Sequence, residues 1–182
     1  MSHSQGDNEA KPAALVLCGG HSARMGIAKA GLPFGDVTML LRVIDRVAVQ
    51  CDPIVVVAAA DQSLEQLRLW CPDVESRCLV TRDRRADRGP LEGLIAGLEL
   101  LATTSKGRPR WRPDLSTQLC YATSCDVPLL QPGWITALAA RIGDAQAAVP
   151  VDDRFHHPLA TLYRANVLSA LRQLDARDEL RP

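Results

Sequence analysis

Short apolar runs alternate with segments of helical periodicity along this chain, and this alternation constrains the fold more than any other feature. Residues 13–18 are continuously apolar and end at a pair of glycines, which is typical of a strand covered on both faces. Apolar residues then recur with helical period over residues 40–48, and Thr38 is placed to cap that helix. A β-branched run over residues 54–57 follows. Strand, helix and strand in this order predict a parallel sheet with right-handed crossovers.

The rest of the chain repeats the alternation. The expected strands cover residues 77–80, 119–124, 147–151 and 159–163, and the expected helices cover residues 63–69, 91–101, 131–139 and 165–174. Between residues 103 and 118 the composition turns to Ser, Thr, Pro, Gly, Lys and Arg, which predicts a surface loop insertion. We therefore expect a three-layer α/β fold, with a mostly parallel sheet between helices on both faces. It should form a single domain over residues 13–182, after a disordered tail over residues 1–12.

The balance of charge excludes one broad class of function. Lys and Arg together number 21 and Asp and Glu together number 21, so the formal net charge is +0 and no global field would hold a polyanion. We therefore expect no nucleic-acid partner. Aromatic residues make up only 4% of the chain, which leaves few rings on which bases could stack. A bound nucleotide would have to be held by backbone groups and charges.

The sequence also lacks the patterns of membrane proteins. No stretch approaches the roughly 18 apolar residues that a membrane-spanning helix needs. The polar start of the chain has no basic region followed by an apolar one, as a signal peptide would. These observations predict a cytoplasmic protein that has no membrane contact.

The cysteines and histidines show no spacing that is typical of a metal centre. The six cysteines form no CxxC pair, and four of them stand in or beside apolar runs. This favours small buried apolar side chains over the alternative of a redox or metal role. His156 and His157 are adjacent and would point to opposite sides of a strand, so a structural or substrate-contacting role is favoured over metal binding.

A glycine-rich segment follows the first expected strand. Residues 17–29 read Leu-Cys-Gly-Gly-His-Ser-Ala-Arg-Met-Gly-Ile-Ala-Lys and combine three glycines with Arg24 and Lys29. Glycines allow backbone N–H groups to approach a phosphate closely, and the two cations can neutralise charge during phosphoryl or nucleotidyl transfer. Lys29 lies three residues after Gly26, which does not match a Walker A loop, and no GxGxxG motif is present. The alternative is a glycine-rich turn with surface cations.

Residues 17–29 are similar to the N-terminal signature of the MobA-like nucleotidyltransferases, and further segments match that family in the same order. Residues 89–97, Gly-Pro-Leu-Glu-Gly-Leu-Ile-Ala-Gly, resemble its Gly-Pro-Leu segment, and residues 124–129, Ser-Cys-Asp-Val-Pro-Leu, resemble its Cys-Asp-x-Pro segment. A weaker match is residues 157–163, His-Pro-Leu-Ala-Thr-Leu-Tyr. The resemblance implies a Rossmann-like nucleotidyltransferase fold. It further implies that the chain transfers GMP from GTP to molybdopterin with Mg²⁺, releases pyrophosphate, and has transient contact with other proteins of molybdenum cofactor biosynthesis.

The resemblance also implies roles for individual residues at the site. The backbone of Leu17, Cys18 and Gly19 would contact the base and ribose, and Gly20 with Arg24 would face the triphosphate. Lys29 would stabilise the charge that builds up at the α-phosphate and on the departing pyrophosphate. Gly89, Pro90 and Leu91 would line the base pocket at the start of a helix.

Two aspartates complete the implied site. Asp126 follows an expected central strand, at the edge of the sheet where ligands of open α/β sheets bind, and would bind Mg²⁺. Arg24 and Lys29 would face Asp126 across this edge. The alternative for Asp126 is a cap on the turn into Pro128. Asp83 falls near a nucleotide-contacting Asp of the family, although its charge-dense surroundings are equally typical of a solvated loop.

The chain departs from the family pattern at several positions. Ala28 stands where an Asp normally precedes the signature Lys, Ala58 falls near an expected Asn, and Glu92 replaces an Ala close to the expected anionic ligand. Cys18 replaces a small Ala. The chain also ends before the family's Val-Asn-x-Asn-Thr-Pro segment. Two alternatives are therefore a related transferase that uses CTP or another acceptor, and a nucleotide-binding module without catalytic activity.

Overall fold

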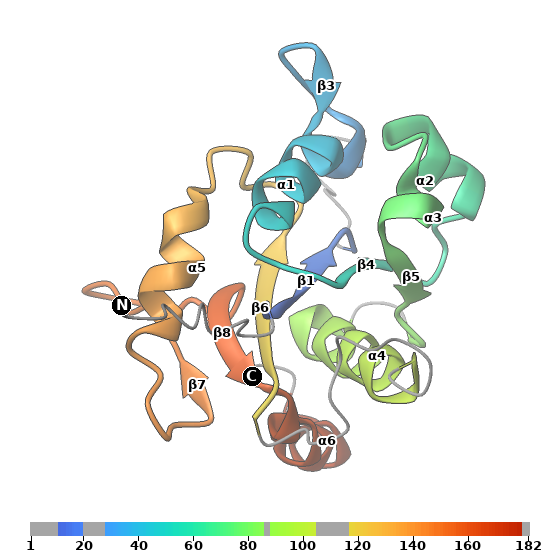
Figure 1. The fold of residues 1–182 in the computed structure, drawn as a ribbon. Helices are drawn as coiled ribbons and strands as arrows, with labels where there is room; N and C mark the ends of the chain where they lie inside the picture. Colours follow the sequence, from blue (N-terminus) through green and yellow to red (C-terminus); the bar gives the residue numbers. More distant parts are fainter. Residues whose placement is uncertain (1–10, 20–27, 86–87, 105–116, 180–182) are drawn as a thin grey trace, which may run out of the picture.

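The computed structural model describes residues 11–19, 28–85, 88–104 and 117–179. Six strands in these residues form one sheet in the order β5-β4-β1-β6-β8-β7 (Figure 1). The strands are β1 (Ala13–Leu17), β4 (Ile54–Ala58), β5 (Leu79–Arg82), β6 (Leu119–Ser124), β7 (Ala147–Ala148) and β8 (Ala160–Arg164). Strands β1, β4, β5 and β6 are parallel, and β8 is antiparallel to both β6 and β7. A separate hairpin consists of β2 (Pro33–Phe34) and β3 (Val37–Thr38).

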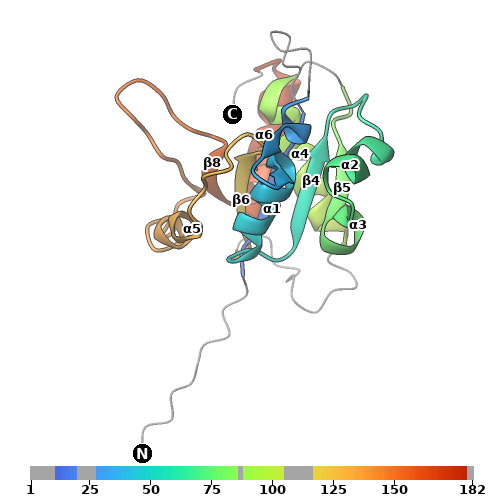
Figure 2. The same ribbon diagram turned by 90° about the horizontal axis from the view of Figure 1, so that it is seen from above.

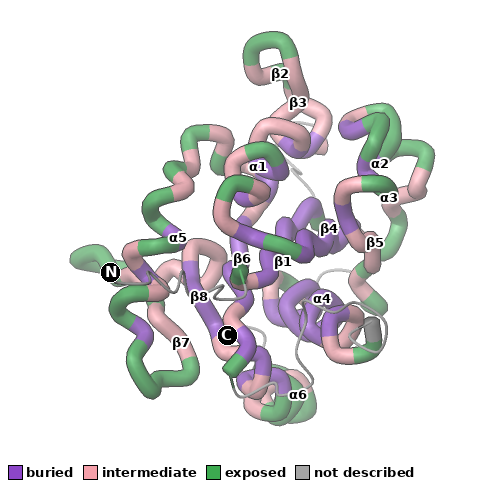
Figure 3. Tube along the Cα trace, in the orientation of Figure 1, coloured by how far each residue is buried: buried purple, intermediate pink, exposed green. Residues whose placement is uncertain are grey.

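Helices cover both faces of this sheet. The helices and 3₁₀ turns are η1 (Lys29–Gly31), α1 (Met39–Ala48), α2 (Leu64–Trp70), α3 (Val74–Arg77), α4 (Gly89–Thr104), α5 (Pro132–Ala139), η2 (Ala165–Val167) and α6 (Leu168–Ala176). One buried cluster joins the sheet to α1, α2, α3 and α5, and the other joins it to α4 and α6. Figure 3 shows the buried strands between these two layers. The expected three-layer α/β fold is confirmed.

Successive side chains of β1 point to opposite faces of the sheet and so contribute to both buried clusters. Ala14 and Val16 belong to the cluster under α1, whereas Leu15 and Leu17 belong to the cluster under α4. All five residues of β1 are buried, because β4 and β6 flank it and helices lie on both of its faces. The continuous apolar run in the sequence reflects this double coverage.

Side chains cap two helix starts, and the sequence predicts one of these caps, Thr38. The Thr38 hydroxyl accepts a hydrogen bond from the backbone N–H of Leu41 at 3.3 Å. Ser63 and Gln66 form a reciprocal capping box at the start of α2. Both pairs satisfy N–H groups that have no partner within the helix.

Several boundaries differ from the sequence-based expectations. Residues 77–80 do not form one strand, because Arg77 ends the short helix α3 and β5 begins at Leu79. The strand expected over residues 147–151 is paired only at Ala147 and Ala148, since Pro150 has no N–H to continue the ladder. Helix α4 begins at Gly89, two residues earlier than expected, and α6 follows the short turn η2.

Strand β8 reverses the direction of the sheet. It begins at Ala160, next to Thr123 near the carboxyl end of β6. Seen from above in Figure 2, the segment between β7 and β8 projects away from the sheet. Val151 and His156 form an isolated antiparallel bridge within this segment.

The domain boundaries remain predictions. The expected tail and loop insertion fall mostly on residues 1–10 and 105–116, which lie outside the described residues. Within the described part of the chain, no helix is long and apolar enough to cross a membrane.

Candidate active site

A cavity of about 360 Å³ lies at the carboxyl edge of the parallel strands. Leu17 at the end of β1 and Ser124 at the end of β6 both line this cavity. The chain moves outward from β1 through β4 to β5 and then returns to add β6 on the other side of β1. Ligands of open α/β sheets bind at such a point, where the strand order reverses.

Several predicted site residues line the cavity. They are Leu17, Gly19, Asp83, Gly89 and Pro90. The sequence did not single out the other lining residues as site residues, and these are Val57, Ala59, Ala60, Asp61, Arg88, Gly93, Ser124 and Leu159. Three of them, Ala59, Ala60 and Asp61, directly follow β4, and their signal in the sequence was their position after an expected strand. The others lie within strands, beside or within α4, or just before β8.

Lys29 and Asp126 form an ion pair at this edge, although they are 97 residues apart in the chain. The Lys29 ammonium donates a hydrogen bond to Asp126 Oδ2 at 2.7 Å. The side chains are 46% and 31% exposed, so a ligand can reach both of them. Neither residue lines the cavity itself, but Asp126 lies only two residues beyond Ser124, which does.

Their mutual contact favours the charged state of both groups. Burial alone would raise the pKa of Asp126, but hydrogen bonds from Lys29 and Ser124 and the charge of Lys29 outweigh it, so this pKa is lowered. The hydrogen bond to Asp126 and the charge of its carboxylate raise the pKa of Lys29. A permanent cation therefore stands beside a permanent carboxylate.

The turn that carries Lys29 is held by apolar packing. A Cβ atom on Gly31 would come within 2.3 Å of Nε1 in the Trp70 indole, so only glycine fits beneath this ring. The Thr38 hydroxyl donates to the backbone oxygen of Trp70 at 2.5 Å and fixes the end of α2. Ala28, just before Lys29, makes no side-chain capping bond to η1. Trp70 and Gly31 are thus positioning residues that the sequence did not reveal.

Asp83 has a buried oxygen that lacks a partner. Its backbone N–H donates to Ala58 O at 2.9 Å, which places it directly beyond β5. Among the described residues, Asp83 Oδ1 is buried and has no hydrogen-bond partner. Burial and the charge of Glu92 raise the pKa of Asp83 to about 6. A group that lines a cavity with an unsatisfied oxygen is suited to contact a ligand donor.

Two glycines provide the space in front of Asp83. A Cβ atom on Gly19 would approach Asp83 Oδ2 to 2.9 Å, and one on Gly93 would approach Leu17 Cδ2 to 2.8 Å. The ends of β1 and β5 and the first turn of α4 can therefore lie close together only because these positions carry no side chain. The carboxylate of Asp83 belongs to the cavity wall rather than to an open solvated loop.

The other predicted residues have different surroundings. The Leu91 side chain is 1% exposed in the core and does not line the cavity, because α4 turns that face toward the sheet. Cys18 is also buried, and its hydrogen bond with Cys125 and its burial raise the pKa of its thiol. Gly20 and Arg24 lie outside the described residues. His157 Nε2 lies 2.9 Å from Asp152 Oδ2, on the segment between β7 and β8.

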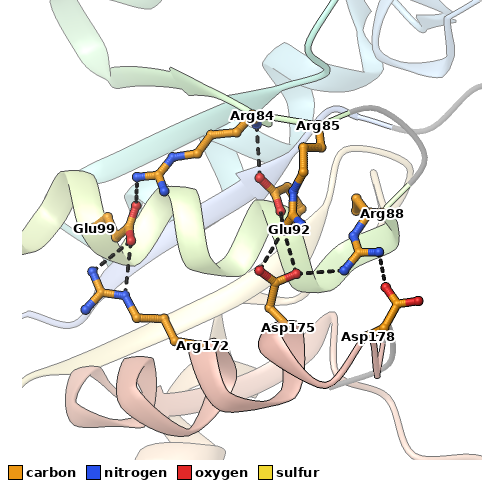
Figure 4. A network of polar contacts seen from close by, with 8 residues as sticks. All are labelled: Arg84, Arg85, Arg88, Glu92, Glu99, Arg172, Asp175 and Asp178. Carbon is orange, nitrogen blue, oxygen red and sulfur yellow. Dashed lines mark hydrogen bonds and ion pairs between the residues drawn. The ribbon is translucent and has the colours of Figure 1, made fainter.

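The structure shows the surroundings of Glu92 and Ala58, which both depart from the family pattern. Glu92 is 3% exposed, but Arg85 donates to its Oε2 at 2.7 Å and the backbone N–H of Arg84 donates to its Oε1 at 3.2 Å (Figure 4). Its charge is therefore compensated before any ligand arrives. Ala58 is completely buried at the end of β4. All six cysteines are buried and free, which confirms that they are part of the apolar core.

Asp126 is a carboxylate at this edge that could contribute one ligand to a divalent metal ion. Among the described residues, no group of three or more His, Cys, Asp or Glu side chains could hold a metal ion. Mg²⁺ commonly takes one or two carboxylates and completes its coordination with water and phosphate oxygens. Asp126, which is ionised and accessible, can supply one such carboxylate.

Comparisons with known proteins identify relatives of this chain. The model of the MobA-like NTP transferase domain matches residues 14–182. A probable molybdenum cofactor guanylyltransferase from Mycobacterium avium (strain 104) is 34% identical over 168 residues, which cover 90% of this chain and 75% of the relative.

Two solved structures share the fold. The crystal structure of molybdopterin-guanine dinucleotide biosynthesis protein A from Archaeoglobus fulgidus has a TM-score of 0.66 and 18% identity, with 93% of this chain and 75% of that chain covered. A Mycobacterium tuberculosis H37Rv protein in complex with manganese has a TM-score of 0.58 and 19% identity, with 90% and 76% covered.

Proposed function

Because this chain belongs to the MobA-like NTP transferase family, we propose that it is a Mg²⁺-dependent nucleotidyltransferase that transfers GMP from GTP to a molybdopterin-type acceptor. The observation that carries this proposal is the Lys29–Asp126 ion pair at the same sheet edge as the cavity, with Asp126 two residues beyond the lining residue Ser124. A metal-bound nucleotide needs a pocket for the nucleoside and charged groups for the metal and the phosphates. Both are found here, at the sheet edge where the strand order reverses. Cytoplasmic location and contact with other proteins of molybdenum cofactor biosynthesis belong to the same proposal.

In the proposed complex the cavity holds the guanine base and the ribose. Backbone groups of Leu17, Cys18 and Gly19 lie at the end of β1, and Gly89 and Pro90 begin α4 on the opposite wall. The unpartnered Oδ1 of Asp83 accepts a hydrogen bond from the nucleoside. Gly20 and Arg24 are assigned to the triphosphate by their place in the family signature.

The proposed reaction is an in-line displacement at the α-phosphorus of GTP. A phosphate oxygen of molybdopterin forms the new P–O bond, and the bond to the β-phosphate breaks, so that its electron pair leaves with pyrophosphate. Lys29 stabilises the negative charge on the α-phosphate and on the departing group. Asp126 would hold Mg²⁺, which when bound neutralises phosphate oxygens. Such a reaction depends on positioning and charge more than on acid–base catalysis.

The decisive experiment measures pyrophosphate release by the full chain with GTP, Mg²⁺ and molybdopterin. We expect release that requires both GTP and the acceptor, together with formation of the guanylylated product. GTP binding without any release in the presence of the acceptor would contradict catalysis and favour the non-catalytic module.

A thermal-shift comparison of GTP, CTP, ATP and UTP tests the nucleotide. We expect GTP with Mg²⁺ to raise the unfolding midpoint most, because a ligand that binds only the folded state stabilises it. Preferential stabilisation by CTP would instead favour a related cytidylyltransferase.

A further inference from the structure

A network of ion pairs joins the cavity wall to the C-terminal helix (Figure 4). Its members come from the β5–α4 loop, from α4 and from the α6 region. They are Arg84, Arg85, Arg88, Glu92, Glu99, Arg172, Asp175 and Asp178. None of the α6 residues takes part in the proposed reaction.

Asp175 stands at the centre of this network. Arg85 Nη2 donates to both of its carboxylate oxygens, at 2.5 and 2.6 Å. Arg88 Nη2 donates to Oδ1 at 2.9 Å, and Arg88 also pairs with Asp178. One carboxylate on α6 therefore binds two arginines that are about 90 positions away in the chain. We call Asp175, Arg85 and Arg88 the α6 clamp.

The clamp acts on the part of the loop that borders the cavity. Arg88 lines the cavity and directly precedes Gly89 and Pro90, which line it as well. Arg85 lies two positions after Asp83, whose backbone N–H is bound to Ala58 at the end of β4. The loop is thus attached to the sheet at its start and to α6 through Arg85 and Arg88.

The clamp also brings compensating charges together at this wall. Arg85 and Arg88 repel each other, and Asp175 compensates both of them. At the same time Arg85 donates to Glu92 Oε2 at 2.7 Å, and the Glu92 side chain is only 4% exposed. Asp175 therefore holds Arg85 in the position from which it compensates a buried carboxylate near Asp83. A buried carboxylate that loses its counter-charge is strongly disfavoured.

We propose that Asp175 is a positioning residue for nucleotide binding, which acts from α6 by holding Arg85 and Arg88 so that Asp83 and the residues from Arg88 to Pro90 keep a fixed place in the cavity wall. This inference rests on the proposed function in one respect, namely that the cavity is the nucleotide site. Asp175 does not touch the nucleotide. Its contribution is to reduce the ordering that the loop would otherwise undergo when the ligand binds.

The test compares Asp175→Asn with Arg172→Gln in the full chain. Asparagine keeps the size of the side chain but loses the charge that holds two arginines. Arg172 is the control, because it also joins α6 to α4, through Glu99 at 2.7 Å. Arg172 is linked to the β5–α4 loop only indirectly, since Glu99 also binds Arg84, whereas Asp175 binds Arg85 and Arg88 directly. Asp175→Asn removes the ion pairs of α6 with Arg85 and Arg88, and Arg172→Gln removes the ion pair of the same helix with Glu99.

The first measurement is hydrogen exchange of the free protein. We expect the amides of Asp83 and Arg84 to exchange about tenfold faster in Asp175→Asn than in the wild type, because the loop opens more often. Arg172→Gln should leave these rates within about twofold of the wild type. A purely structural role of the helix would change both variants alike.

The second measurement is nucleotide affinity, with whichever of the four nucleoside triphosphates shifts the wild-type unfolding midpoint most. We expect Asp175→Asn to raise Kd about fivefold and to change kcat by less than about twofold, since it alters binding and leaves Lys29 in place. Unchanged loop exchange and Kd in Asp175→Asn, or equal changes in Arg172→Gln, would overturn the proposal. If that nucleotide is not GTP, the proposed function fails, while the exchange rates still decide the role of Asp175.

Discussion

The two walls of the candidate active site are held by different forces. The wall that carries Lys29 rests on apolar packing, with the Trp70 indole against Gly31, and it makes one exposed ion pair with Asp126. The wall formed by the β5–α4 loop is held by ion pairs, in which Arg85 and Arg88 bind Asp175 on α6. Packing of the backbone next to Lys29 therefore holds this residue in place, and its side chain remains free to change partners. In the proposed reaction, its ammonium group would exchange the Asp126 carboxylate for a phosphate while Trp70 and Gly31 keep η1 in place.

The largest effect is expected from substitutions that remove the Lys29–Asp126 ion pair. Lys29→Ala or Asp126→Ala should reduce pyrophosphate release by about 100- to 1000-fold, because the first removes the cation that faces the developing negative charge and the second removes the carboxylate that is proposed to hold Mg²⁺. The free energy of unfolding should change by less than about 1 kcal/mol, since the ion pair is exposed. Steady-state kinetics and urea unfolding measure the two quantities.

Lys11→Ala is the matched control for Lys29→Ala. Lys11 is an exposed lysine that precedes β1 and donates to Val49 O, at the opposite end of that strand from the cavity. It should retain wild-type turnover. Full activity in both site variants would refute the assignment of the site.

The next largest effect tests whether packing holds the Lys29 wall. Gly31→Ala should lower the free energy of unfolding by about 2 kcal/mol, because the new methyl group would overlap the Trp70 ring. It should also reduce turnover, since η1 must shift together with Lys29. Gly133→Ala is the control, because an added Cβ there has no atom within 4 Å. If both variants were equally stable, packing against Trp70 would not be what fixes this wall.

The smallest effect concerns the unpartnered carboxylate in the other wall. The pKa of Asp83 is raised to about 6 in the folded protein, above its ordinary value of 3.8. Between these two values the folded state binds more protons than the unfolded state, so the free energy of unfolding falls as pH rises through this window. Asp83→Asn should remove this fall and be more stable than the wild type by roughly 1 kcal/mol at pH 7.5, but not at pH 4, since solvent screens part of the burial penalty.

Urea unfolding at pH 4 and pH 7.5 measures this difference. Asp153→Asn, on the exposed segment before β8, provides a control carboxylate. The same Asp83→Asn variant should bind GTP more weakly, because it loses the proposed acceptor for the nucleoside. A stability difference that is independent of pH would show that Asp83 carries no burial penalty.

Local patterns in the sequence predicted most of the fold but not its long-range contacts. The apolar runs that became β1 and β6 have almost the expected bounds, since a strand covered on both faces leaves a continuous apolar signal. The direction of β8 was not predictable, because the apolar pattern of a strand is the same in either orientation. Likewise, Arg77 looked like part of a strand although the hydrogen bonds of residues 73–78 form a helical turn.

The site was predictable where strand ends bring residues together. Lys29 and Asp126 were expected at one sheet edge, and the structure brings them to 2.7 Å. Asp83 was ambiguous, because its burial depends on Gly19 and Gly93 from other elements. The contacts of Asp175 with Arg85 and Arg88 leave no local pattern, since charged residues on a surface helix are ordinary. Such contacts follow from the packing of α6 on α4, which only the three-dimensional structure shows.

The reversed strand β8 has a consequence for how such a site can diversify. In a wholly parallel sheet every loop at the ligand edge follows a strand, whereas here the segment before β8 also reaches that edge, and Leu159 lines the cavity. This segment projects from the sheet (Figure 2). Its length and composition can therefore vary during evolution without disturbing the loops after β1, β4 and β6. The fold thus offers one region beside the cavity that can change in length independently of those loops.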